Sequence, residues 1–240
     1  MLKIDPTLPD WIRNYAYPGA IEVDGTLTDE NAFWFLLTAC CPLIFQSYAI
    51  LLHPFKVNWK LKQEIDTGLT VNLDKNKADF KRVSWKDFFA YYGKSFDINS
   101  AYTTQEELRK VFAENNNWPP YLYYPGQDNY EDVEIIIKEL IGIYVDQLVN
   151  YYYFLENTKV WDNGDIIYEG YLSEFEKLRQ QDDIDDTPNS IFPLTKEWCM
   201  LSDVDLPFTY IGGTTELINK ITRNKKLEIF KLEPIFKEKA

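Results

Sequence analysis

Two aspartates, Asp203 and Asp205, stand two residues apart in the stretch SDVDL. That spacing places both side chains on one side of a strand, or together in one turn. Paired carboxylates can divide acid and base roles in catalysis, or bind a divalent cation. The further oxygen ligands of a calcium loop of the DxDxDG type are missing. A carboxylate-based enzyme that uses Asp203 and Asp205 is therefore one hypothesis, and a structural turn is its competitor.

His53 is the only histidine of the chain, and it lies between an apolar run and Pro54. Its ordinary pKa lies near neutrality, so it could serve as a general base beside the two aspartates. A histidine satisfied by structural hydrogen bonds is the competing interpretation. The sequence also lacks the GxSxG and HExxH motifs.

The three cysteines, Cys40, Cys41 and Cys199, show no metal-ligand spacing. Together with the single histidine, this argues against a histidine-built metal centre, and we expect no metal and no cofactor. Cys40 and Cys41 also lack basic neighbours that would lower a thiol pKa. We interpret them as packing residues, in the reduced state that a cytoplasmic protein keeps.

The stretch IGGTTEL, around Gly212 and Gly213, has the strand–glycine–helix form of many phosphate sites. It matches neither GxGxxG nor GxxxxGK[ST]. Glu216 falls in the first turn of the expected helix, where its charge would repel a phosphate. We therefore expect a strand-to-helix corner capped by threonine. A phosphate ligand at Gly212-Gly213 is a third hypothesis.

Aromatic residues make up 16% of the chain, with 7 Trp, 17 Tyr and 15 Phe. Tyrosine and tryptophan dominate the hot spots of protein interfaces. The stretches WPPYLYY and KVWDNG could present Trp118, Tyr121 and Trp161 on a surface as a protein-binding patch. Buried, the same side chains would anchor loops.

The formal net charge is −13. An acidic surface repels nucleic acid and anionic lipid and attracts a basic protein, with an attraction that salt weakens. The N-terminus has no signal-peptide pattern, so we expect a cytoplasmic protein. The uncharged stretch Ala32–Leu52 is long enough to span a bilayer, but Pro42 and its polar residues predict two buried elements instead.

Hydrophobic periodicity and capping residues predict an α+β fold in one domain, residues 1–240, with a soft division near 120–130. A mostly antiparallel sheet should come from the C-terminal half, joined by the apolar run near residue 48, with helices packed on one face. Residues 1–27 and 57–81 are predicted to be mainly loop. The predicted caps are Thr28, Ser84, Thr103, Asp128 or Asn129, and Ser173. The expected helices cover residues 29–39, 85–92, 103–115, 129–145, 173–181 and 214–224.

Four blocks carry a resemblance to a known group of proteins. They are His53-Pro54, Val83–Trp85, Trp118–Pro120 and the long block WCMLSDVDLPFTYIGGTTELI, Trp198–Ile218. With them the chain resembles a group of bacterial hypothetical proteins that has no established function. The resemblance implies a common fold and no particular activity. The acidic, aromatic-rich composition is also similar to that of many toxin-immunity proteins.

The leading hypothesis is a non-enzymatic cytoplasmic protein-binding module, with an immunity-type inhibitor of a basic protein as one form of it. The acidic charge, the aromatic excess and the lack of a catalytic motif favour it. The alternatives are the carboxylate enzyme and, third, the phosphate binder. We expect a protein partner, and no nucleic acid or membrane partner.

Overall fold

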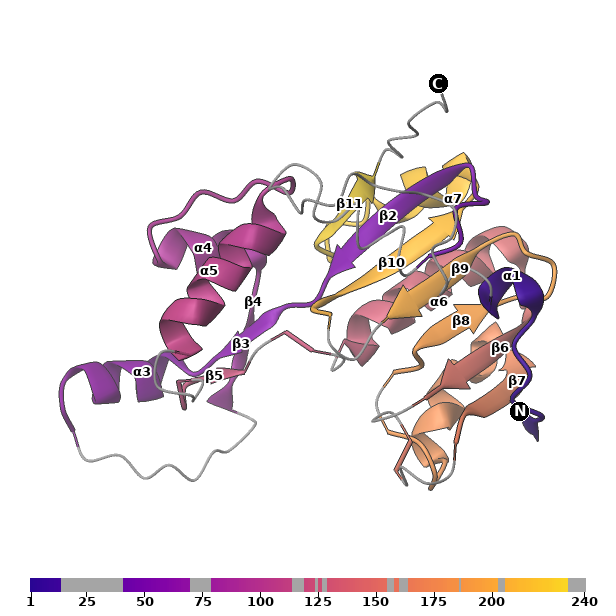
Figure 1. The fold of residues 1–240 in the computed structure, drawn as a ribbon, viewed down its shortest axis with the longest axis horizontal. Coiled ribbons are helices and arrows are strands. Elements are labelled where there is room, and N and C mark those ends of the chain that lie inside the picture. The colour runs from indigo at the N-terminus through magenta and orange to yellow at the C-terminus, as the bar shows by residue number, and fades with distance from the viewer. Residues whose placement is uncertain are drawn as a thin grey trace. The chain divides into compact units, whose positions relative to one another are not determined.

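The computed structural model describes residues 1–13, 41–69, 79–113, 119–123, 125–126, 129–154, 158–159, 164–185, 187–202 and 206–232. These residues form two compact units (Figure 1). Unit 1 holds the described residues up to His53 and those from Gly126 onward. Unit 2 holds the described residues of Pro54–Pro125.

Unit 1 is built on an eight-stranded sheet in which every pairing is antiparallel. Six of the eight strands follow residue 147, so the predicted α+β fold with its C-terminal antiparallel sheet is confirmed. In spatial order the strands are β1 (Leu2–Ile4), β7 (Ile166–Tyr171), β6 (Leu148–Tyr153), β8 (Ser190–Phe192), β9 (Cys199–Ser202), β10 (Phe208–Gly213), β2 (Ser47–Leu52) and β11 (Ile229–Leu232).

Strand β2 lies inside the sheet, and its sequence SYAILL is buried along its whole length. It pairs with β10, where Ile50 faces Tyr210, and with β11, where Ile50 faces Phe230. A strand that is buried on both faces is apolar throughout rather than alternating, which is why the apolar run near residue 48 marked it in the sequence. Regular strand structure begins at Ser47.

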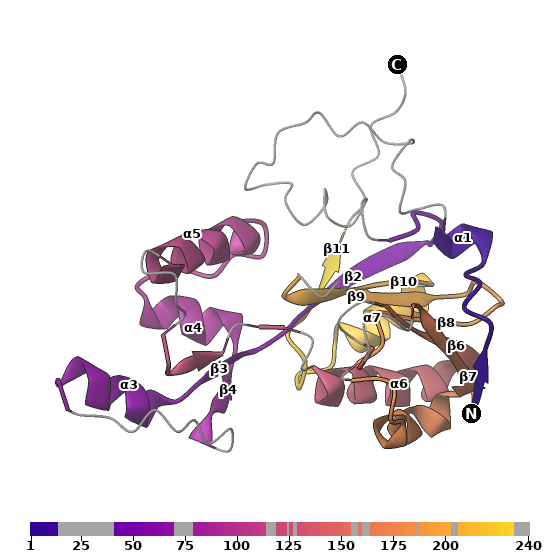
Figure 2. The same cartoon turned by 60° about the horizontal axis from the view of Figure 1, so that its bottom comes forward.

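Three helices cover one face of this sheet (Figure 2): α6 (Tyr130–Tyr144), α7 (Thr215–Ile221) and the 3₁₀ helix η5 (Leu172–Gln180). The apolar stripe predicted for residues 129–145 packs here, with Val133, Ile136 and Leu140 in the core. The short helix α1 (Asp10–Arg13) contacts the other face, where the Trp11 ring meets Phe192 edge-on at 5.6 Å.

Unit 2 combines a three-stranded antiparallel sheet with three helices. The strands are β4 (Lys81–Val83), β3 (Phe55–Val57) and β5 (Leu122–Tyr123), and the helices are α3 (Trp59–Asp66), α4 (Trp85–Tyr91) and α5 (Ala101–Ala113). The Phe55 and Phe88 rings stack at 3.7 Å, which fixes α4 against β3. Ser84 caps α4 by accepting a hydrogen bond from the Asp87 amide, as predicted.

Two segments predicted as loop or coil are regular. The prediction for the segment after β3 was wrong, because α3 forms there with Asn58 as its cap, accepting a hydrogen bond from Leu61 N. Its polar composition reflects a largely exposed helix rather than a loop. Strand β1 was likewise predicted as coil, although Leu2–Ile4 pairs with the edge of β7. The helix predicted from Thr28 lies outside the described residues, as do residues 70–78 of the predicted loop.

Three residues predicted to cap helices make no such side-chain cap. Thr103 lies inside α5, and its hydroxyl donates to Ser100 O. Ser173 lies inside η5, and its hydroxyl donates to Asp146 Oδ2. Asn129 stands at the start of α6 but makes no side-chain cap bond.

In the described part of the chain, no helix is long and apolar enough to cross a bilayer. Of the stretch Ala32–Leu52, residues 32–40 lie outside the described residues, and Ser47–Leu52 forms β2.

Candidate functional site

His53 lies directly after β2 and is 0% exposed. Its Nε2 accepts a hydrogen bond of 2.7 Å from the Asn129 side-chain amide and lies 2.8 Å from Thr209 Oγ1. The same amide also donates to Thr209 Oγ1 at 3.1 Å, and Thr187 Oγ1 donates to Asn129 Oδ1 at 2.9 Å. All four side chains are buried, and they join the end of β2, the start of α6 and β10.

This buried polar cluster keeps His53 neutral. Burial lowers the pKa of the imidazole to about 3, although a hydrogen bond with the Gly126 backbone acts in the opposite direction. Because the Asn129 amide donates to Nε2, the hydrogen-bond pattern assigns the ring proton to Nδ1. The arrangement suits a structural histidine that ties three segments together.

The two candidate carboxylates, Asp203 and Asp205, lie outside the described residues, in the connection between β9 and β10. The described residue before them, Ser202, has its hydroxyl 2.5 Å from Thr209 Oγ1. Whether the carboxylates approach His53 therefore stays a prediction.

The two glycines form the end of β10, and each is packed closely by a side chain. A Cβ added to Gly212 would stand 2.3 Å from Phe45 Cδ2, and one added to Gly213 would stand 2.7 Å from Leu217 Cδ2. Thr214 caps α7 by accepting a hydrogen bond from Leu217 N, as predicted. Glu216 lies in the first turn, also as predicted. The glycines are therefore explained by the closeness of these side chains.

An exposed aromatic cluster lies on unit 2. We call Trp59, Lys62, Tyr91 and Tyr121 the aromatic surface. The Trp59 and Tyr91 rings lie 4.5 Å apart, with 37% and 49% of these residues exposed. Lys62 Nζ lies 5.3 Å from the centroids of both tyrosine rings.

Three elements position this surface. Residues 59 and 62 fall on one side of α3 because side chains three apart in a helix are neighbours. Tyr91 ends α4, and Tyr121 comes just before β5. The hydrogen bond from Lys62 to Asp66, 2.6 Å long, raises the pKa of the ammonium and keeps it charged beside the rings.

Of the three predicted partner-binding residues, the structure describes only Tyr121, which is half-buried. Trp118 and Trp161 lie outside the described residues. Trp59 was missed because the segment of α3 was predicted to be a loop, and Tyr91 was missed because its ring contact with Trp59 joins α4 to that segment. Asn58, a good helix cap directly before Trp59, was the sequence signal that could have revealed α3.

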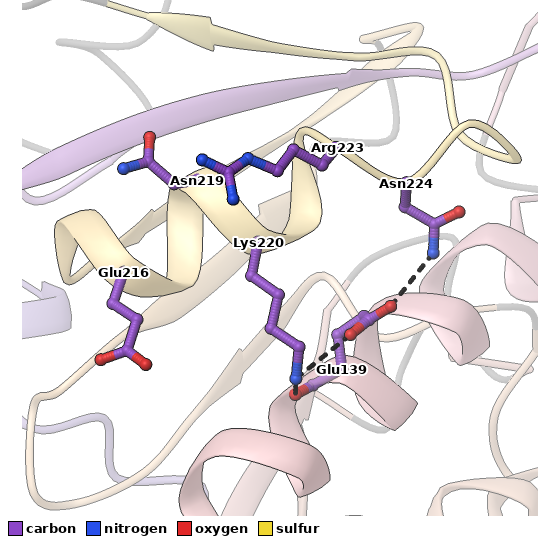
Figure 3. Close-up of a pocket in the computed structure, with 6 residues that line it drawn as sticks. All are labelled: Glu139, Glu216, Asn219, Lys220, Arg223 and Asn224. Atoms are coloured by element: carbon purple, nitrogen blue, oxygen red, sulfur yellow. Dashed lines mark hydrogen bonds and ion pairs between the residues drawn. The ribbon is translucent and has the colours of Figure 1, made fainter.

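A pocket of about 590 Å³ lies between α6 and α7 (Figure 3). Lys220 Nζ lies 3.3 Å from Glu139 Oε2, and Asn224 donates to Glu139 Oε1 at 3.2 Å. The lining residues are Glu139, Glu216, Asn219, Lys220, Arg223 and Asn224.

Within the described ranges, no three histidine, cysteine or acidic side chains gather as metal ligands would. No protein-family model, curated protein or solved structure matches the chain. The proposals below therefore depend on the residues of the chain itself.

Proposed function

We propose that the chain is a non-enzymatic, cytoplasmic protein-binding module whose partner is a basic protein. The observation that carries the proposal is the aromatic surface of unit 2. An immunity-type inhibitor, which holds a basic toxin inactive, is one form that such a module takes.

Partly exposed, packed rings are well suited to binding. Trp59 and Tyr91 support each other, so little side-chain entropy remains to be lost when a partner covers them. Tryptophan and tyrosine also contribute large apolar area with a polar edge, as interface hot spots do. Burial of these two rings would stabilise a complex without any rearrangement of the core.

The aromatic surface favours a cationic partner. The faces of Tyr91 and Tyr121 already attract the Lys62 ammonium, which lies at the distance of a cation–π contact. Arginine or lysine side chains of a partner can make the same contact with the exposed Trp59 ring. A basic protein presents such side chains in number.

The net charge outside residues 54–125 supports the same kind of partner. Residues 54–125 carry 11 Lys and Arg and 9 Asp and Glu, a net charge of +2. The rest of the chain carries 14 Lys and Arg and 29 Asp and Glu, a net charge of −15. The acidic remainder would steer a basic protein toward the molecule at long range, while the nearly neutral unit 2 supplies short-range contacts.

The surroundings of His53 argue against its use as a general base. A general base must reach its substrate with an available nitrogen. Nε2 of His53 instead accepts a hydrogen bond inside the buried polar cluster, and the residue is 0% exposed.

The test is affinity capture from native lysate with three baits: the wild-type chain, the double variant Trp59→Ala/Tyr91→Ala, and the control Tyr171→Ala. Tyr171 is 50% exposed and lies on unit 1, so the control removes a ring of similar exposure elsewhere. We expect wild type and control to capture the same basic protein at low salt, and the double variant to lose it.

Salt provides the second comparison. Capture should weaken at about 0.5 M NaCl, where the Debye length is only a few ångströms. Equal capture by the double variant and the control, or an acidic captured protein, would contradict the proposal.

A further inference from the structure

Two buried thiols from distant parts of the sequence meet in unit 1. The Sγ atoms of Cys41 and Cys199 lie 3.9 Å apart, although 158 positions separate the residues. Both cysteines are in the thiol form, and their exposures are 1% and 0%. The sequence assigned Cys41 a packing role only, because nothing in its spacing connects it with Cys199.

Cys199 lies in a regular strand, whereas Cys41 lies in an irregular segment. Cys199 begins β9, where it faces Gly212 in the sheet. Cys41 belongs to the irregular segment 41–46 that leads into β2. The Tyr48 hydroxyl fastens this segment, because it accepts a hydrogen bond from Phe45 N at 2.8 Å and donates to Pro42 O at 3.2 Å.

The two sulfur atoms need only a small movement to reach bonding distance. Sulfur atoms in a disulfide are about 2.05 Å apart, so the thiols must approach each other by about 1.9 Å. Rotation of the Cys41 side chain, together with a shift of the irregular segment 41–46, would supply this movement. Cys199 can keep its place in β9.

We propose that Cys41 and Cys199 form a reversible intramolecular disulfide, with a small-molecule disulfide such as oxidised glutathione as the oxidant. Local opening of segment 41–46 exposes one protein thiolate, which attacks the oxidant, forming a mixed disulfide and releasing one glutathione thiolate. The second protein thiolate then attacks the mixed disulfide at the protein sulfur and releases the other glutathione. Two protein thiols are oxidised, one oxidant is reduced to two thiols, and the two protons end on the released glutathiones.

The bond has a measurable consequence. It closes a loop that runs from segment 41–46 to β9, and a cross-link across a long loop removes conformational freedom from the unfolded chain. The midpoint of thermal unfolding should rise by about 5–10 °C on oxidation and fall again on reduction. This inference concerns unit 1 and is independent of the proposed partner binding.

The test uses the full chain in native buffer. Wild type and the variants Cys40→Ser, Cys41→Ser and Cys199→Ser are incubated with oxidised glutathione, denatured, alkylated with iodoacetamide and mapped by peptide mass spectrometry. We expect a peptide pair joining Cys41 to Cys199 in wild type and in Cys40→Ser. The pair should be absent from the other two variants and should disappear after dithiothreitol treatment.

Three results would overturn the proposal: three alkylated cysteines in oxidant-treated wild type, a link that includes Cys40, or glutathione adducts with no protein cross-link. The peptide maps of wild type and Cys40→Ser show whether the Cys41–Cys199 link forms, even if another variant fails to fold. Cys199→Ala, which keeps an apolar side chain in the core, replaces Cys199→Ser if circular dichroism shows that the serine variant is unfolded.

Discussion

The ring of Phe45 lies directly against the backbone of Gly212, on the opposite side of the sheet from α6 and α7. The closest ring atom would stand 2.3 Å from any Cβ at position 212, too near for an alanine to fit without movement of the ring or the strand. Phe45 belongs to segment 41–46, so this contact couples that segment to β10.

Gly212→Ala should therefore destabilise the protein, lowering the free energy of unfolding by about 1–3 kcal/mol, as overpacking of a core does. Gly142→Ala is the matched control. A Cβ there meets only Lys220 Nζ, at 2.9 Å, which is the flexible end of a side chain. Alanine should also favour helix α6. Urea denaturation measures both changes, and equal losses would show that the Phe45 contact is not decisive.

Stability should fall as the pH drops below 6.5 because of His53. Its folded-state pKa is lowered from 6.5 to about 3, so between these values the unfolded chain binds a proton that the folded protein refuses. Folding then loses up to about 1.4 kcal/mol for each pH unit. Above about pH 5 most carboxylates stay ionised, so urea denaturation between pH 6.5 and 5 isolates this effect.

His53→Gln is the comparison for that experiment. The variant should be less stable than wild type near pH 7, because the buried polar cluster is disturbed, but its stability should change less between pH 6.5 and about 5. Parallel pH profiles of variant and wild type would show that His53 does not titrate in this way.

Asn129 and Asn58 should differ in the cost of substitution by alanine. Asn129→Ala removes the amide N–H group shared by His53 and Thr209 and the carbonyl oxygen to which Thr187 Oγ1 donates, so we expect a loss of about 2–3 kcal/mol. Asn58→Ala removes one partly buried cap bond of α3 and should cost about 1 kcal/mol. Equal costs in urea denaturation would mean that Asn129 acts mainly as a helix terminus.

The aromatic surface should contribute little to folding. Trp59→Ala should lower the free energy of unfolding by about 1 kcal/mol, since 37% of the residue is exposed. Phe88→Ala, which removes the ring stacked on Phe55, should cost about 3–5 kcal/mol. If the two costs were similar in urea denaturation, Trp59 would be a core residue, and loss of partner capture would reflect unfolding.

Much of the fold could be predicted because local signals agreed with the tertiary structure. The apolar run of β2, the stripe of α6 and the caps Ser84 and Thr214 each follow from neighbouring residues alone. The failures have physical causes. Helix α3 buries only Leu61 fully, so its sequence is mostly polar, and β1 is a three-residue edge strand held by its pairing with β7.

The buried polar cluster around His53 was harder to predict than the fold, because its contacts join distant segments of the sequence. His53, Asn129, Thr187 and Thr209 meet only after the sheet and α6 have assembled. Asn129 has the composition of a cap, and its actual role depends on which side chains surround it. Tyr121 was identified by its aromatic neighbourhood, whereas its neighbour Lys62 comes from a segment that was assigned no structure.

The position of β2 inside the sheet has a consequence for synthesis of the chain on the ribosome. Its two neighbours, β10 and β11, come more than 150 residues later. At 5–20 residues per second, the apolar segment Ser47–Leu52 waits about 8–30 s for its first partner strand. The residues of unit 2 that follow His53 are all made within that interval. We therefore expect the nascent chain to depend on chaperones that shield β2 until the last quarter of the sequence has emerged.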